Sequence, residues 1–517
     1  MVSFIRSLWR HLLAATLTLR LRLFNVHPSP VPVDQPGIIV VQIDGLGYNV
    51  LQEAMKRGDA PFLRWLTHRG GYTLDSYFCG VPSITTAIVA ELMYGKSENI
   101  PGYTWFHRML GRFIRGDHGG QVKKLEETLF AGVTHPLIEG GSCIIGAYSG
   151  GATMTNISPD AKATKSRLHR LLSFRILLVP LLNPFRFWHI ILVLAGSVVA
   201  MMLKALSKQS KKVFEEEFST LLNRLFLCDL ATTIAIIDIW RKTPAMYINL
   251  SLVDKVSHTH GIRHPIVFQS IRLMDLYCKK LYDSARGAER SYKFIVLSDH
   301  GQSPGIPFEK ISDETLPHLM SRGLGDKGPN VLLTYGNDHD LKENTAEDTV
   351  YAVPSSSIAH LYFSRWLPAQ ANQQTIEHDF PSLIPTLLSH PGIGWVMVRQ
   401  NEKTTYLLAR NGDRAEFENG KVKATRGKPI DDPEADSLLK ALARLALGHN
   451  NGDLVLFGGN WRGAWASFEP YWGTHGSFTG EMVKPFLITD DSKLTDLLGN
   501  HRPMHDLFAR IREMRGK

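Results

Sequence analysis

Three apolar, strand-like segments of this 517-residue chain each run directly into an aspartate. The segment IIVVQI ends at Asp44, YINLSLV ends at Asp254, and FIVLS ends at Asp299. Short apolar runs of this kind favour buried strands of a parallel sheet, and functional groups collect just beyond the carboxyl ends of such strands. The pattern therefore predicts an α/β sheet with three carboxylates gathered at one edge.

Histidines accompany these aspartates. His258 follows Asp254 by four residues, His300 follows Asp299 directly, and His475 lies in a late Gly-Thr-His-Gly segment. A spacing of four places Asp254 and His258 on one helical turn, where both can bind the same metal. Three carboxylates and three imidazoles form a ligand set for two borderline divalent metals. We expect zinc, with manganese as the alternative.

A hydroxyl-rich segment precedes a helix-like run. In Pro-Ser-Ile-Thr-Thr, Thr85 stands just before the apolar stretch 87–94. A hydroxyl at this position has two interpretations. It caps the helix N-terminus, or it is a nucleophile that attacks a phosphate held by free backbone N–H groups and by metal. Ser83 and Thr86 are alternative nucleophiles in the same segment.

Strand-like and helix-like segments alternate from Gly37 onward. This order predicts an α/β domain with a mostly parallel central sheet and helices on both faces. The strand-like segments are 38–43, 143–146, 246–253, 293–298, 394–399, 453–457 and 484–489. The helix-like segments are 85–94, 213–241, 264–285, 373–388, 433–447 and 493–515.

The net charge of +9 comes from one segment rather than from the whole chain. Residues 161–214 contain ten Lys or Arg and no Asp or Glu, which leaves about −1 for the rest. The same segment contains an apolar run, 187–203, interrupted by His189. Basic residues around an apolar stretch favour an anionic membrane surface over nucleic acid.

A single membrane crossing by this segment would separate Asp44 from Asp254, and one active site could not form. We therefore expect an inserted apolar helical segment that dips into the membrane as a hairpin or lies along its surface. The alternative is a helix pair buried in the protein or in an oligomer.

We divide the chain into four parts. Residues 1–36 combine a basic amphipathic segment with a proline-rich linker. Residues 37–160 and 213–517 form two parts of a catalytic domain, with cap or additional sheet elements expected in 340–450. Residues 161–212 form the basic apolar insert. Its basic flanks predict that both ends face the cytoplasm, so we expect the protein at the cytoplasmic face of the inner membrane.

These motifs, and the order in which they occur, resemble those of the alkaline phosphatase superfamily. They are Asp44-Gly, Thr85 in PSITT, DKVSHTHG from Asp254, SDHG around Asp299, and GTHG around His475. As an ordered set they are similar to the type I phosphodiesterase/nucleotide pyrophosphatase branch. The bacterial membrane-linked members of that branch also carry runs such as SDHGQS and HPGIGWV, which this chain contains.

This resemblance implies an alkaline phosphatase-like fold, two divalent metals and Thr85 as the nucleophile. The seven motif residues would be divided between the metals: Asp254, His258 and His475 for one, and Asp44, Asp299, His300 and the Thr85 oxygen for the other. The implied activity is hydrolysis of a phosphate diester, either a nucleotide or a phospholipid head group, through a phospho-threonine intermediate.

The chain departs from the family pattern after the nucleophile. Relatives often continue with Phe-Pro-Asn, whereas this chain has Thr86-Ala87-Ile88, so the phosphate-binding Asn is unassigned and Asn99 and Asn156 are candidates. PSITT contains no arginine, which makes the phosphomonoesterase branch a weaker match. Two other functions stay open: transfer of a phosphoethanolamine or glycerophosphate group to an alcohol, and a non-enzymatic scaffold with a degenerate site.

Several further side chains have more than one interpretation. Tyr103, Trp105, Phe106 and Trp472 either line a substrate pocket or pack in the core. His260 has three interpretations: a substrate contact, a residue that supports a metal ligand, or an ordinary surface residue.

Overall fold

The computed structural model describes residues 33–116, 119–156, 227–326, 328–335, 348–499 and 504–515. The predicted insert at 161–212 and nearly all of the segment 1–36 lie outside these residues. Within the described ranges, no helix combines the length and the apolar character that a membrane crossing requires.

A seven-stranded sheet forms the centre of the fold, and five adjacent strands in it are parallel. In order across the sheet, these are β8 (Tyr292–Leu297), β1 (Gly37–Ile43), β7 (Ala245–Leu250), β5 (Ser142–Ile144) and β6 (Met154–Asn156). Two strands complete the other edge: β21 (Phe486–Thr489) runs antiparallel to β8, and β2 (Thr73–Ser76) runs antiparallel to β21. The mostly parallel central sheet predicted from the sequence is confirmed.

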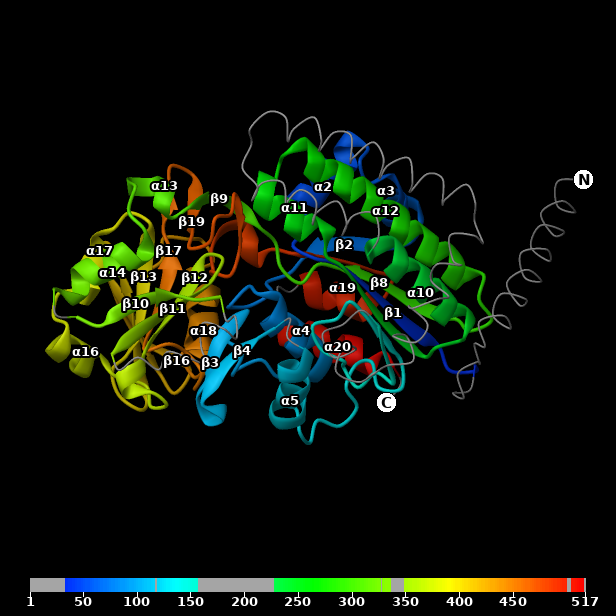
Figure 1. Ribbon diagram of the computed structural model, residues 1–517. Helices are drawn as coiled ribbons and strands as arrows, with labels where there is room; N and C mark the ends of the chain where they lie inside the picture. Colours follow the sequence, from blue (N-terminus) through cyan, green and yellow to red (C-terminus); the bar gives the residue numbers. More distant parts are fainter. Residues whose placement is uncertain are drawn as a thin grey trace, which may run out of the picture.

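Both faces of this sheet are buried, which explains why β1 is apolar along nearly its whole length. Alternate residues of β1 belong to different cores: Ile38 and Val40 face one, and Ile39 and Val41 face the other. The helices divide in the same way. The first core is covered by α4 (Thr85–Tyr94), α19 (Ser492–Gly499) and α20 (Met504–Glu513), and the second by α2 (Tyr48–Arg57), α3 (Pro61–Arg69), α10 (Cys228–Trp240), α11 (Leu252–His260) and α12 (Pro265–Arg286) (Figure 1).

A second, eight-stranded sheet lies beside the first (Figure 1). Its order is β10 (Asn330–Leu333), β11 (Thr349–Ser355), β12 (Ile358–Phe363), β17 (Leu454–Gly458), β13 (Ile393–Arg399), β14 (Thr404–Ala409), β15 (Arg414–Glu418) and β16 (Lys421–Arg426). All pairs except β10 with β11 are antiparallel. The predicted strands 394–399 and 453–457 therefore belong here and not to the central sheet, because apolar runs indicate burial without indicating the partner strand.

Helices cover this second sheet too. One face packs against α14 (Leu316–Leu324), α16 (Gln373–Asp379) and α17 (Leu383–Ser389), and the other against α18 (Ala435–Leu445). The predicted helix 373–388 is divided at Phe380-Pro381, because a proline disfavours helical backbone at the residue before it. The core on the α18 side is continuous with the core around α4, so the two sheets share one hydrophobic interior.

The remaining described strands and α-helices are mostly short. They are β3 (Thr104–His107), β4 (Arg112–Arg115), α5 (Gly119–Leu129), β9 (Ser303–Pro307), α13 (Glu309–Ser312), β18 (Asn460–Trp461), β19 (Ala464–Ser467) and β20 (Gly473–Thr474). Among them β9 matters most for function, because it pairs with both β19 and β20. This pairing brings the chain after β20 next to the chain that precedes β9.

A buried ion pair links Asp453, just before β17, to Arg108, just after β3. Asp453 accepts hydrogen bonds from the backbone N–H groups of Phe363 and Ala371, both at 2.8 Å, and pairs with Arg108 at 3.3 Å. We expect Asp453→Ala to lower the free energy of unfolding by about 3–5 kcal/mol, because it removes the charge partner of Arg108 and leaves two buried N–H groups without their acceptor.

Urea denaturation measures this effect. Asp283→Ala is the matched control, because it removes a surface pair with Lys279 in which both side chains are about half exposed, and such pairs contribute only about 0–1 kcal/mol. Equal midpoints for the two variants would contradict the assignment of Asp453 as a stabilising residue.

Candidate active site

Adjacent strands deliver the predicted carboxylates to one edge of the central sheet. Asp44 follows β1, and Asp299 follows β8, which is its parallel neighbour. Asp254 stands in the first turn of α11, just after β7 on the other side of β1. The convergence expected at the carboxyl ends of the strands therefore occurs.

Gly45 allows the carboxylates to come close together. Its φ of +70° lies in the left-handed region, and a Cβ at this position would stand 2.6 Å from Asp254 Oδ1. Only glycine satisfies both conditions without strain. Its N–H also donates to Asp299 Oδ1 at 3.3 Å, so this one residue contacts two of the three acids.

One group of ligand-type atoms consists of Asp254, His258 and His475. His258 Nε2 and His475 Nε2 lie 3.2 Å apart, and they are 3.4 and 3.7 Å from Asp254 Oδ1. The other ring nitrogen of each histidine contacts a backbone carbonyl: Gly473 O at 2.7 Å for His258, and Ser83 O at 2.8 Å for His475.

These carbonyl contacts decide which way the imidazoles face. Since a carbonyl oxygen only accepts, Nδ1 of each neutral ring carries the proton and Nε2 presents a lone pair. Two lone pairs and the Asp254 carboxylate then meet at one point and require positive charge between them. A divalent cation supplies that charge, and Asp/His ligation of this kind fits zinc. The residues of this group therefore fit a metal.

The second group contains Asp44, Asp254 and His300, whose ligand-type atoms all lie within 4.8 Å of one another. His300 Nδ1 contacts Gly301 O at 2.9 Å, so its Nε2 faces Asp44 Oδ1 at 3.7 Å and Asp299 Oδ2 at 3.4 Å. Asp299 Oδ2 is buried and has no hydrogen-bond partner among the described residues. A buried carboxylate oxygen of this kind also fits a cation.

Burial and the neighbouring charges shift the pKa values of the site's titratable groups in different directions. Burial raises the pKa of Asp44 well above its usual value, and repulsion from Asp299 and Asp254 adds to this. Burial, followed by repulsion from His300, lowers the pKa of His475 well below its usual value. Burial acts to raise the pKa of Asp254 as well, but the neighbouring histidines, His258 first, outweigh it and the net shift is downward.

Thr85 faces the second group. Its hydroxyl lies 3.4 Å from Asp44 Oδ1 and 3.2 Å from His300 Nε2. Ile84, not Thr85, is the N-cap of α4, and no side chain caps this helix. The first interpretation from the sequence, a helix-capping hydroxyl, is therefore wrong for Thr85.

The two alternative nucleophiles have other partners. Ser83 is fully buried; its hydroxyl donates to Ser477 O at 2.6 Å and accepts from the N–H of Gly476 at 2.9 Å. Thr86 is also buried, and its hydroxyl donates to Gly102 O at 2.9 Å. Of the three hydroxyls, Thr85 alone contacts the ligand-type residues.

Sequence reasoning missed two amides that hold the carboxylates. Gln302 Nε2 donates to Asp254 Oδ1 at 2.5 Å, and Asn249 Nδ2 donates to Asp44 Oδ2 at 2.8 Å. Gln302 is part of SDHGQS, so its position two residues after the predicted ligand pair Asp299-His300 was a usable signal. Asn249 carried no such signal, because nothing in the sequence distinguishes an amide that holds a ligand at the end of a strand from an amide with a purely structural role.

The other predicted side chains are divided between core and surface. Trp105 is fully buried and Phe106 nearly so, whereas Tyr103 and Trp472 are exposed. Asn99 accepts from the N–H of His449 at 3.3 Å, in a contact with the loop after α18. His260 stacks on His264 with ring centres 5.0 Å apart.

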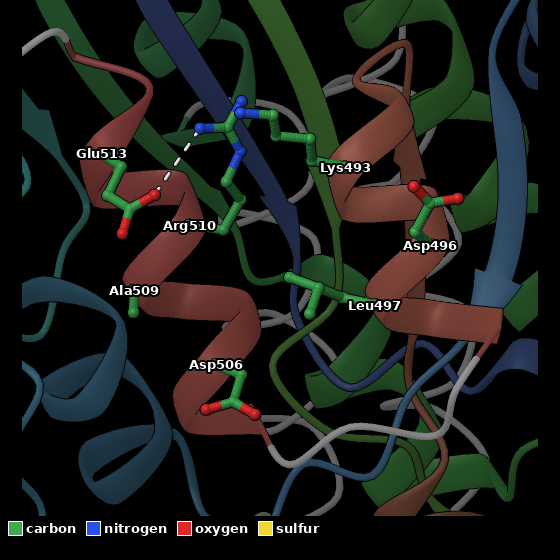
Figure 2. A pocket seen from close by; sticks show the side chains of 7 residues that line it. All are labelled: Lys493, Asp496, Leu497, Asp506, Ala509, Arg510 and Glu513. Carbon is green, nitrogen blue, oxygen red and sulfur yellow. Dashed lines mark ion pairs between the residues drawn. The ribbon is translucent and has the colours of Figure 1, made fainter.

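A surface cavity of about 450 Å³ lies between α19 and α20 (Figure 2). It is lined mainly by charged side chains, including Lys493, Asp506 and Arg510, and none of the seven predicted site residues lines it. This cavity is therefore separate from the candidate active site.

Comparison with known proteins identifies the class of enzyme. The family model described as type I phosphodiesterase / nucleotide pyrophosphatase matches residues 38–420. The chain is thus an enzyme that acts on phosphoester bonds. It belongs to the type I phosphodiesterase / nucleotide pyrophosphatase family. The resemblance predicted from the motifs is confirmed.

Solved structures with related folds share little sequence with this chain. Phosphonoacetate hydrolase from Sinorhizobium meliloti 1021, in complex with phosphonoformate, is 13% identical, with 93% of this chain and 96% of that chain covered and a TM-score of 0.48. Murine ectonucleotide pyrophosphatase / phosphodiesterase 5 is 11% identical, with 93% and 95% covered and a TM-score of 0.48. A search of curated proteins found no match.

Proposed function

We propose that this enzyme is a two-metal-dependent phosphodiesterase that cleaves a phosphate diester through a phospho-threonine intermediate at Thr85. The observation that carries the proposal is the position of the Thr85 hydroxyl, which lies within 3.4 Å of both Asp44 and His300 at the N-terminus of α4. Family membership supports the reaction class.

Two sets of residues would hold the metals. Asp254, His258 and His475 would bind one, and Asp44, Asp299 and His300, with the Thr85 oxygen, would bind the other. When bound, the cations would neutralise charge on the phosphate and favour the ionised form of the Thr85 hydroxyl.

The chain itself supplies the nucleophile and part of the anion site. Thr85 Oγ1 attacks phosphorus, the bond from phosphorus to the leaving alcohol breaks, and the alcohol oxygen takes up a proton. The first N–H groups of α4 have no acceptor within the helix, and they point toward the developing charge at the positive end of the helix dipole. Water then hydrolyses the threonine ester and releases the phosphate monoester.

Chromogenic substrates test the reaction class. We expect the purified protein, supplied with zinc or manganese, to cleave bis(p-nitrophenyl) phosphate faster than p-nitrophenyl phosphate. Cleavage of the monoester alone would identify a phosphatase instead. Bound metal without turnover on either substrate would favour a transferase or a scaffold.

Gln302 should control the affinity for metal. Because its amide fixes the Asp254 carboxylate, we expect Gln302→Leu to weaken zinc binding by about 10–100-fold, as loss of a ligand-orienting partner typically does. Titration of the metal-stripped protein with zinc measures this without reference to activity. Gln52→Leu, whose amide donates to the Tyr48 hydroxyl at 2.8 Å within α2, is the control; equal affinities for both variants would contradict the role of Gln302.

The basic apolar sequence of 161–212 supports a further part of the proposal, association with the cytoplasmic face of the inner membrane. We expect the full chain to float with vesicles that contain anionic lipid and to stay behind with neutral vesicles. Equal recovery with both would contradict an electrostatic contribution from this segment.

A further inference from the structure

A buried turn of the second sheet contacts the segment that carries His475. Ser356 and Ser357 form the two-residue connection between β11 and β12, whose adjoining residues Ser355 and Ile358 are paired. Both serines of the turn are buried. Hairpin connections usually lie at the protein surface, so the burial of this turn calls for an explanation in terms of what it contacts.

The turn holds the main chain of His475 through both of its polar groups. The N–H of His475 donates to Ser356 Oγ at 3.1 Å, and the N–H of Ser357 donates to His475 O at 2.8 Å. The imidazole is held separately, through the contact of its Nδ1 with Ser83 O at 2.8 Å. The turn therefore fixes where His475 stands, and Ser83 fixes the direction in which its ring faces.

The backbone of Ser356 has a conformation that serine disfavours. Its φ of +62° lies in the left-handed region, and two-residue hairpins with a positive φ at the first connecting residue prefer glycine there. Contacts with another segment maintain this conformation: the Ser356 N–H donates to Glu469 Oε2 at 2.5 Å, and Ser356 O accepts from the N–H of Phe468 at 2.8 Å. Backbone strain of this kind concentrates at functional sites. The hydroxyl is the one feature of this residue that glycine lacks.

Both partners of the Ser356 hydroxyl lie in the segment that carries the ligand. Besides accepting from the N–H of His475, it forms a hydrogen bond with Thr474 Oγ1 at 2.8 Å. Thr474 is fully buried and belongs to β20. A hydroxyl can accept and donate at the same time, so this single group serves two buried polar groups. Its removal would leave both without this partner, on the residue before the imidazole and on the histidine itself.

The chain after His475 is also anchored to the second sheet. Phe478 is fully buried, and its ring centre lies 4.8 Å from that of Trp395 in β13 and 5.0 Å from that of Phe457 in β17. His475 is thus held by the second sheet, whereas Asp254 and His258 stand on α11 beside the central sheet. The three ligand-type residues of the first group therefore come from two sides.

We propose that Ser356 is a positioning residue for the metal that Asp254, His258 and His475 would hold. The inference rests on the proposed function, because it requires a metal at this group. Distances between a metal and its ligands vary by only about 0.2 Å, so a small displacement of His475 weakens binding. The hydrogen bonds of Ser356 go to Phe468, Glu469, Thr474 and His475. Its loss should therefore affect the metal of the first group and spare the metal near Thr85.

Titration of the metal-stripped full-length protein with zinc tests this. We expect Ser356→Gly to weaken the binding of one of two zinc equivalents by about tenfold and to leave the other unchanged. Glycine accepts a positive φ, so this variant removes the hydroxyl without adding backbone strain. Ser357→Ala is the matched control, because the Ser357 hydroxyl is equally buried but donates to Ala466 O at 2.8 Å. This variant keeps the N–H that contacts His475 O and should bind zinc as the wild type does.

The outcomes separate this inference from the proposed function. Wild-type affinity for both equivalents in Ser356→Gly overturns the positioning role. Equal losses in Ser356→Gly and Ser357→Ala also overturn it, because the turn would then only support the fold. If Ser356→Gly does not fold, Thr474→Val removes the other hydroxyl of the pair, and unchanged zinc binding in that variant overturns the role. A wild-type protein that binds neither zinc nor manganese would contradict the proposed two-metal function itself.

Discussion

Replacing Thr85 with alanine is expected to lower the rate of diester cleavage by at least about 10³-fold, because the variant has no oxygen to form the covalent intermediate. Thr85→Ser keeps a hydroxyl in the same place and should retain much more activity than Thr85→Ala. The comparison uses kcat for bis(p-nitrophenyl) phosphate with saturating metal.

The neighbouring hydroxyls do not offer an easy replacement. Ser83 is held between Ser477 and Gly476, and Thr86 donates to Gly102, so neither can reach phosphorus without breaking a buried hydrogen bond. Activity of Thr85→Ala within tenfold of the wild type would therefore remove Thr85 from the mechanism.

Asp254→Ala should be the most damaging of the ligand substitutions. Asp254 belongs to both groups of ligand-type atoms, whereas His258 and His300 each belong to one. We expect this variant to lose the metal held with His258 and His475 and to bind the other more weakly, because Asp254 also lies beside Asp44 and His300. Bound zinc should fall from about two equivalents to one or fewer, and diester cleavage by at least about 10³-fold.

Metal analysis after dialysis measures the first effect, and the chromogenic assay measures the second. Asp436→Ala, an exposed acid in the first turn of α18, controls for the loss of a carboxylate. Two equivalents of tightly bound metal in Asp254→Ala would contradict the shared role of this residue.

The sequence predicted the fold and the site best at the ends of strands, where the candidate functional residues lie. The parallel sheet, the residues that follow β1, β7 and β8, and the start of α4 at Thr85 all follow from local apolar patterns and motif spacing. His475 could be placed only through the family resemblance, because it reaches the other ligands through the pairing of β20 with β9, a long-range contact that no local pattern encodes.

The second sheet was harder to foresee for a related reason. Strand 393–399 is apolar enough to predict burial, but its neighbours β14 and β17 are set by tertiary packing. Asn249 was missed for a different reason: it is an ordinary polar residue in the sequence, and only its distance to Asp44 makes it relevant.

The stereochemical course at phosphorus tests the central claim most directly. Each in-line displacement inverts phosphorus, so attack by Thr85 followed by attack of water gives overall retention. A phosphorothioate diester of known configuration, hydrolysed in water enriched in oxygen-18, reports the outcome. We predict retention of configuration, and inversion would show that water attacks the diester directly and that no phospho-threonine forms.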